Sequence, residues 1–148
     1  MNLLFDSNIL IHLAKDGSRR LLTTVINPDN QKIFVSVVSI AELKSIALQN
    51  KWGVRKWEVI NAILDEAVII EINEGLTDTY AEIDAFSQRR SPSYASYSFG
   101  TPRNMGKNDL WIASTAALLG LKLVTTDADF NHLHQIFIDV EHIKPEFL

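Results

Sequence analysis

The chain has 148 residues, 47% of them hydrophobic, and a formal net charge of -4. This length and composition predict one globular domain over residues 1–148 with a sizeable core. The acidic balance argues against a protein that coats nucleic acid by bulk electrostatic attraction. Because cysteine is absent, disulfides and thiolate metal sites are excluded and a reducing, cytoplasmic setting is favoured. No apolar run is long enough to cross a membrane.

Short apolar runs and helical stripes alternate along the first two thirds of the chain. Residues 3–5 form an apolar run that ends at Asp6, and residues 7–17 have the length of a helix that stops at Gly17. A β-branched run then predicts a strand over 32–37, and apolar spacing predicts a helix over 39–49. Further on we expect a helix over 54–65, a strand over 67–72 and a helix over about 76–90.

The segment 91–106 is rich in serine, proline and glycine, which predicts one long irregular loop. After it we expect a helix that ends at Gly120, a strand over 121–126, a short helix or turn over 127–134 and a last strand over 136–139. Strands that are apolar without alternation, separated by helices, indicate an α/β protein. The prediction is a three-layer α/β/α domain whose mainly parallel central sheet has about five strands.

Acidic residues stand where these elements end or begin. Asp6 ends the first strand, Asp127 ends the strand over 121–126, Asp109 begins the preceding helix, and Glu42 lies one turn into the helix over 39–49. Ligands of parallel sheets gather at the carboxyl ends of the strands, so these acids could converge. Crowded carboxylates raise one another's pKa unless a cation neutralises them, and oxygen ligands favour Mg²⁺ or Mn²⁺. With these acids and Asp129 set aside, the rest of the chain has a formal charge of +1.

Each acid also has a structural interpretation. Ser39 and Glu42 match a capping box, in which the glutamate returns a hydrogen bond to the start of its helix. The aspartates suit ordinary roles as caps, first-turn residues or turn residues: Asp6, Asp109, Asp127 and Asp129. The joint pattern is more specific than any of its members.

Four segments, in this order, resemble the signatures of PIN-domain ribonucleases, and above all VapC toxins of bacterial type II toxin-antitoxin pairs. They are FDSNILI (5–11), SIAEL (39–43), GKNDLWIASTA (106–116) and LVTTDADF (123–130). The resemblance runs from Leu3 to about Phe130. It implies a PIN-like fold and a Mg²⁺-dependent endoribonuclease that cuts single-stranded or looped RNA with activated water, leaving 5′-phosphate and 3′-hydroxyl ends. It also implies a cognate VapB-like antitoxin and a homodimer.

The resemblance further implies roles for individual residues. The acids Asp6, Glu42, Asp109 and Asp127 would bind the metal, with Asp129 as a fifth catalytic acid, and Glu42 or Asp129 would orient or deprotonate water. Polar residues that would support these ligands are Asn8, Asn108 and Thr126. Whether one or two ions bind stays open.

The loop over 91–106 combines cations that could meet phosphates with rings that could stack on unpaired bases. The candidate RNA-binding residues are Arg89, Arg90, Tyr94, Tyr97, Arg103 and Lys107, together with Phe99. The alternative is a mobile loop, or one that only a partner protein orders.

Other functions and weaker candidates remain open. The chain could be a free-standing PIN nuclease of RNA processing or a noncatalytic PIN-like binding module. Asp6 could also be the nucleophile of a Mg²⁺-dependent phosphatase or phosphotransfer domain, although the aspartate that one such fold expects two residues later is Asn8 here. The histidines are too scattered for a zinc site, and we expect them to be structural or surface residues: His12, His132, His134 and His142. Trp52 and Trp57 suit the core, or a groove for an antitoxin segment.

Overall fold

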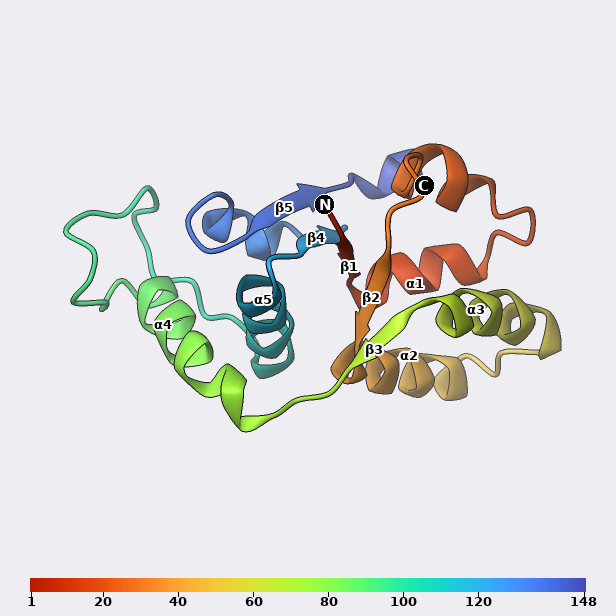
Figure 1. Ribbon diagram of the computed structural model, residues 1–148, viewed down its shortest axis with the longest axis horizontal. Helices are drawn as coiled ribbons and strands as arrows, with labels where there is room; N and C mark the ends of the chain where they lie inside the picture. Colours follow the sequence, from red (N-terminus) through yellow and green to blue (C-terminus); the bar gives the residue numbers. More distant parts are fainter.

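The computed structural model describes residues 1–148 as a sheet between two helical layers (Figure 1). The sheet has five strands in the order β3-β2-β1-β4-β5, and every neighbouring pair is parallel. The strands are β1 (Leu3–Phe5), β2 (Ile33–Ser36), β3 (Val68–Ile70), β4 (Lys122–Thr125) and β5 (Asp139–His142). The prediction of a three-layer α/β/α fold with about five strands is confirmed, and the sheet is parallel throughout.

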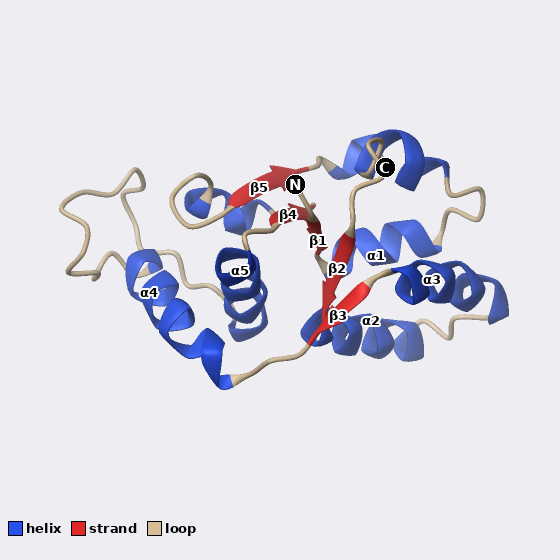
Figure 2. Cartoon of the chain, in the orientation of Figure 1, coloured by secondary structure: helices blue, strands red, loops and turns tan.

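The helices fall into two groups, one on each side of the sheet (Figure 2). One group comprises α1 (Ser7–Ala14), α2 (Val37–Gln49) and α3 (Val54–Glu66), and the other comprises α4 (Thr77–Ser87) and α5 (Lys107–Leu119). Shorter helical turns cover Leu22–Ile26, Glu74–Leu76, Ala128–Leu133 and Pro145–Phe147. No helix is both long and apolar enough to pass through a bilayer.

β1 lies at the centre of the sheet and contributes to a hydrophobic core on each face. Leu3 and Phe5 pack into the cluster that contains α1 and α3, whereas Leu4 packs into the cluster that contains α5. All three side chains are buried because successive residues of a covered strand point to opposite faces. The absence of polar alternation in this strand therefore has a direct structural cause.

Most boundaries differ by one to three residues from the sequence-based expectation, the first helix ending at Ala14 and not at Gly17, and two of the differences have a clear physical cause. α2 begins at Val37, because the Ser36 hydroxyl accepts a hydrogen bond from the Val38 amide at 3.1 Å and caps the helix. The last strand, predicted over 136–139, lies at Asp139–His142. The apolar residues before it, Phe137 and Ile138, pack into the α5 core from a turn, so their hydrophobicity reflects burial and not strand pairing.

Residues 91–106 contain no helix or strand, and the aromatic rings of this loop pack against the end of α4. The Phe86 ring centroid lies 4.7 Å from that of Tyr94, 5.3 Å from that of Tyr97 and 5.5 Å from that of Phe99. The Tyr97 hydroxyl also accepts a hydrogen bond from the Ser91 amide at 2.9 Å. These contacts fold the loop onto the domain.

Candidate metal centre

The first two acids leave the sheet from neighbouring strands. β1 pairs with β4 with Phe5 opposite Val124, and the Asp6 amide donates to the Val124 carbonyl at 3.1 Å. Asp6 directly follows β1, and Asp127 lies two residues beyond the end of β4. The parallel pairing therefore delivers both carboxylates to the same edge of the sheet.

α5 brings a third carboxylate to this edge. Asp109 lies in the first turn of α5 and is partly buried. One carboxylate oxygen from each of Asp109, Asp127 and Asp129 can be chosen so that all three lie within 4.8 Å of one another. Such oxygen sets suit a hard divalent cation.

Asp6 is held by hydrogen bonds to both of its carboxylate oxygens. Oδ1 accepts from the Ser7 amide at 2.8 Å, and Oδ2 accepts from the Thr125 hydroxyl at 2.8 Å. The side chain is only 3% exposed. Burial raises its pKa, against the opposing effect of these hydrogen bonds, and the nearby Asp127 raises it further.

The turn after β4 fixes the positions of Asp127 and Asp129. The Thr125 hydroxyl accepts a hydrogen bond from the Asp127 amide at 3.0 Å, and Asp127 Oδ1 accepts one from the Asp129 amide at 2.9 Å. Thr125 is fully buried and thereby links Asp6 to this turn. The Thr125 hydroxyl thus connects this turn to Asp6, which lies 119 positions earlier in the chain than Thr125.

Glu42 does not serve as a helix cap. α2 starts two residues before Ser39, and the buried Ser39 hydroxyl has no hydrogen-bond partner, so the predicted capping box is wrong. Glu42 Oε1 is likewise buried without a partner. Burial and then the charge of Asp6 raise the Glu42 pKa, while Asn108 and Ser7 oppose this effect. A buried carboxylate oxygen without a donor has unused capacity to bind a cation or water.

Asp109 lies close enough to the other acids of the site for their charges to raise its pKa. Burial raises the pKa of this carboxyl to about 7, and the charges of four acids contribute: Asp6, Asp127, Glu42 and Asp129. The positive ends of α1 and α5 lie near the acids and offset part of this repulsion. Repelling carboxylates together with the unpartnered Glu42 oxygen fit a bound divalent cation.

Among the predicted supporting residues, only Asn108 lies against an acid. No hydrogen bond joins Asn8 to any acid, and the hydrogen bond made at Thr126 uses its backbone carbonyl, 3.1 Å from His142 Nε2. The hydroxyl that contacts Asp6 belongs to Thr125. Thr125 ends β4 and Thr126 follows it, and the β1–β4 register places Thr125 beside Asp6.

Two of the predicted cations line cavities beside the acids. Lys107 lines a cavity of about 460 Å³ with Glu42 and Asp109. Arg103 lines a separate cavity of about 160 Å³ with Asp129. Arg89 lies over the Tyr97 ring, 5.4 Å from its centroid. Phe99 is only 6% exposed, so its ring faces are covered by protein.

The histidines lie outside the group of acids that could hold a metal. His132 Nε2 contacts the Ser87 hydroxyl at 2.8 Å, and His134 Nδ1 accepts from the Val140 amide at 2.9 Å. Burial lowers the His132 pKa to about 4, and Arg103 lowers it further, so this imidazole is neutral at pH 7.

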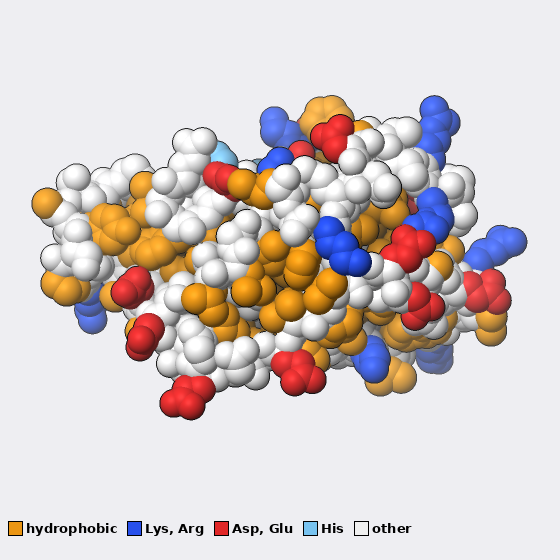
Figure 3. Space-filling view, in the orientation of Figure 1, with side chains coloured by type: hydrophobic (Ala, Val, Ile, Leu, Met, Phe, Trp, Pro, Cys, Tyr) orange, Lys and Arg blue, Asp and Glu red, His pale blue; other side chains and the backbone are white.

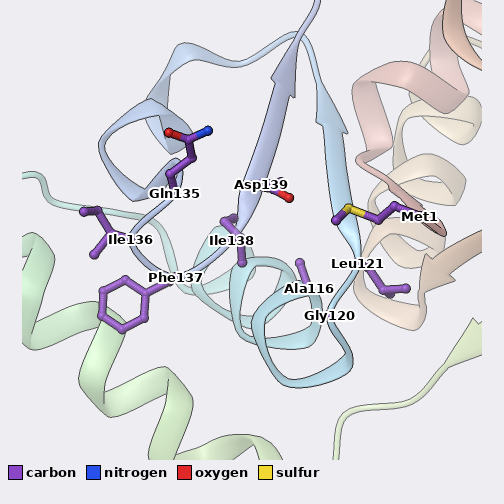
Figure 4. Close-up of a pocket in the computed structure, with 9 residues that line it drawn as sticks. All are labelled: Met1, Ala116, Gly120, Leu121, Gln135, Ile136, Phe137, Ile138 and Asp139. Carbon is purple, nitrogen blue, oxygen red and sulfur yellow. The ribbon is translucent and has the colours of Figure 1, made fainter.

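A further cavity of about 250 Å³ opens near the amino ends of β1 and β4, away from the acids (Figure 4). Met1 and Leu121, which precede these strands, line it together with the turn before β5. A broad hydrophobic patch also occupies the centre of the face shown in Figure 3. Phe34 of β2 is half-buried and packs into the α5 core, and Trp111 contacts Tyr80 with ring centroids 4.5 Å apart.

A family model described as the PIN domain matches residues 3–135. No curated protein matches the chain in sequence. The family match extends over all four segments that carry the acids.

Several solved structures share the fold. A chain of VapBC2 from Rickettsia felis, bound to a DNA fragment from its promoter, gives a TM-score of 0.71 at 21% identity over 96% of this chain and 98% of that one. VapBC-1 from nontypeable Haemophilus influenzae gives 0.67 at 21% identity over 96% and 98%. FitAcB from Neisseria gonorrhoeae gives 0.61 at 21% identity over the full length of both chains. At these identities the likeness establishes the fold.

Proposed function

The chain belongs to the PIN-domain family, and from this premise we propose that it is a Mg²⁺- or Mn²⁺-dependent endoribonuclease, the toxin of a VapBC-like type II pair. One observation carries the proposal: three aspartate oxygens gather within 4.8 Å at the carboxyl edge of the sheet. Asp6 and Glu42 approach the same cluster closely enough to raise the Asp109 pKa. A binding module without catalysis has no need for so costly a concentration of charge.

The aspartates Asp6, Asp109 and Asp127 would hold the cation, with Glu42 and Asp129 beside them. A divalent cation bound here supplies charge neutralisation for a phosphodiester and lowers the pKa of a bound water. Asp6 is fixed by Ser7 and Thr125, so it presents its carboxylate with little reorganisation. Glu42 Oε1 has no donor of its own and is free to accept a proton from the attacking water.

The substrate we propose is single-stranded or looped RNA, cut to leave 5′-phosphate and 3′-hydroxyl ends. Cations near the acids support this choice, because Arg103 and Lys107 line the two cavities that adjoin the carboxylates. Arg89 and Arg90 follow α4 at the start of the loop and are exposed. Tyr94 and Tyr97 are half-buried, so each retains only part of its surface for a base.

The proposed partners are a VapB-like antitoxin and a second copy of the chain, in the cytoplasm. Structural neighbours described as VapBC complexes support the antitoxin. The hydrophobic patch in Figure 3 supports a protein contact on that face. An adjacent gene for a small DNA-binding protein would distinguish a toxin from a free-standing nuclease of RNA processing.

RNA cleavage with two site variants tests the enzymatic proposal. We expect Mg²⁺-dependent cleavage by the wild type, abolished by EDTA and by Asp6→Asn, with the fold of the variant retained. Glu42→Gln should lower the cleavage rate at least 100-fold if Glu42 acts as a base (an estimate on the order of general-base contributions). Full activity of Glu42→Gln would return Glu42 to a structural role, and cleavage that persists in EDTA would refute the metal-dependent mechanism.

The sequence gives less support to Asp6 as a phosphatase nucleophile, because Asn8 stands where one such fold has its second aspartate. Trapping a phosphorylated Asp6 would restore the phosphatase alternative.

A further inference from the structure

Arg103 lies beside the acids on the side where the long loop returns to the domain. Together with Pro102, Asn104 and Met105 it forms one wall of a cavity of about 160 Å³, and Asp129 forms another. The cavity therefore borders the carboxylate group at Asp129 and extends away from it. It offers a guanidinium and an amide, both of which bind phosphate oxygens.

The guanidinium of Arg103 has no ion-pair partner. The one ion pair in the structure joins Arg19 to Glu66 at 3.5 Å, far from this cavity in the fold. Arg103 and Asp129 line the same small cavity without pairing. An unpaired arginine can form charged hydrogen bonds with a phosphate, and its charge offsets the repulsion that the nearby carboxylates exert on that phosphate.

The main chain at Arg103 is fastened to the end of α4. The Arg103 amide donates to the Ser87 carbonyl at 2.7 Å, and Gln88 Nε2 donates to Asn104 Oδ1 at 2.9 Å. The Arg103 guanidinium lies over the Phe99 ring, 5.7 Å from its centroid. Phe99 itself packs on Phe86, so the aromatic cluster of the loop forms a floor beneath the cation.

A second connection ties α4 to the turn that carries Asp129. The Ser87 hydroxyl contacts His132 Nε2 at 2.8 Å, and His132 also has a hydrogen bond to the Asp129 backbone. Ser87 is fully buried and belongs to α4, whereas His132 lies three residues after Asp129. The two walls of the cavity are therefore held at a fixed separation through one serine.

We propose that this cavity binds the RNA phosphate adjacent to the one that is cleaved, with Arg103 as its anion-binding side chain. The inference rests on the proposed function. The phosphate that is cleaved must lie among the acids, so a cation on their border meets its neighbour along the strand. The aromatic residues of the loop then act through Arg103, as a support for the cation, and not as a stacking surface for bases.

Replacing single phosphates of the RNA by uncharged methylphosphonates tests this contact directly. The probe is a single-stranded RNA oligonucleotide that the wild type cuts at one site, synthesised with a methylphosphonate at each flanking position in turn. Binding is measured by fluorescence anisotropy in the Asp6→Asn background, and cleavage in the otherwise wild-type protein. The variants are Arg103→Ala and Arg103→Lys, with Lys107→Ala as the comparison for position and the distant, exposed Arg55→Ala as the control for charge.

We expect Arg103→Ala to weaken binding about 10- to 100-fold, the range typical of a charged hydrogen bond. At one flanking position the methylphosphonate should lower the RNA affinity of protein that contains Arg103. The same methylphosphonate should not lower the affinity of the Arg103→Ala variant any further. Arg103→Lys should restore part of the affinity, since it keeps the charge and loses the planar fork. Lys107→Ala should not couple to that same position, and Arg55→Ala should bind as the parent does.

If the losses of affinity caused by Arg103→Ala and by every methylphosphonate add independently, the subsite is overturned. The proposed nuclease activity is not affected by that result. Coupling in the binding assay without cleavage by the wild type would support a phosphate contact at Arg103 and overturn both the proposed activity and the position of this contact beside a cleaved phosphate. If no RNA cut at a single site is found, the binding cycle uses a 12-nucleotide single strand with the methylphosphonate scanned along it. Absence of coupling at every position of that strand would overturn the subsite.

Discussion

Replacing Asp109 by asparagine should make the metal-free protein more stable at neutral and alkaline pH. The pKa of the Asp109 carboxyl is raised to about 7 by burial and by four neighbouring acids. Above pH 7 the Asp109 carboxyl is therefore ionised in the folded chain at a free-energy cost, and the unfolded chain does not have this cost. Asparagine is nearly isosteric and uncharged, so the variant escapes this cost.

The size and the pH range of the effect follow from the two pKa values. The difference between an ordinary 3.8 and about 7 corresponds to about 4 kcal/mol at full value. Because the carboxyl is partly exposed and salt screens its neighbours, we expect about 1 to 2 kcal/mol. Between pH 4 and 7 only the unfolded chain releases the proton, so the wild-type free energy of unfolding falls across this interval and then levels off. The gain from asparagine should therefore vanish towards pH 4.

Urea unfolding followed by circular dichroism, in EDTA, at pH values from 4 to 8.5, measures this difference. Asp78→Asn is a control for the loss of a first-turn charge, since Asp78 is an exposed aspartate of α4 outside the acidic cluster. It should change the free energy of unfolding by no more than a few tenths of a kcal/mol at any pH, because the helix dipole and the repulsion from Glu74 and Glu82 oppose each other. Added Mg²⁺ should stabilise the wild type at pH 8 and leave Asp109→Asn unchanged.

Two results would refute this reasoning. One is an Asp109→Asn variant that is less stable than the wild type at pH 8 in EDTA. The other is a stability difference between the two proteins that does not change between pH 4 and 8. Either would mean that burial and the neighbouring acids do not raise the Asp109 pKa in the folded chain.

Three further substitutions test contacts around the site and the loop. Thr125→Val removes the hydroxyl between Asp6 and Asp127 and should weaken Mn²⁺ binding, measured by electron paramagnetic resonance, by about 10-fold or more, whereas Thr126→Val should not. Gly120 ends α5 at φ +65°, so Gly120→Ala should lower the urea-unfolding free energy by about 1 kcal/mol, and no loss would contradict the left-handed cap. Tyr97→Phe removes the hydrogen bond to the Ser91 amide and should speed proteolysis within 91–106, and an unchanged cleavage rate would show that this bond does not hold the loop.

The fold was predictable because its elements are locally consistent. The apolar run at 3–5 and the β-branched run at 32–37 have no amphipathic alternative, and both became central strands. The final strand was not predictable from hydrophobicity. Residues 136–138 are more apolar than the strand that follows, yet Phe137 and Ile138 pack into the core from a turn, Ile136 is exposed, and β5 is an edge strand with half-buried residues.

The acids were predictable in part because each stands beside a strand end or a helix start. Their sequence position could not decide between a cap and a ligand, and the structure shows why. Asp6 caps α1 through Oδ1 and lies next to Asp109 and Glu42 in the same site, so the two roles coexist. The contribution of Thr125 was hidden because it depends on a pairing between distant strands.

The central place of β1 has a consequence for synthesis of the chain. The first strand made is flanked in the sheet by β2 and by β4, which ends at Thr125, and the hydroxyl that holds Asp6 is among the last parts of the site to be synthesised. Long-range pairing of this kind forms late and slowly. A nascent polypeptide that stops before Thr125 has Asp6, Glu42 and Asp109 but no β4 to gather them. The site is thus assembled only after Thr125 and the aspartates that follow it have been synthesised, so a shorter nascent chain lacks the complete group of acids.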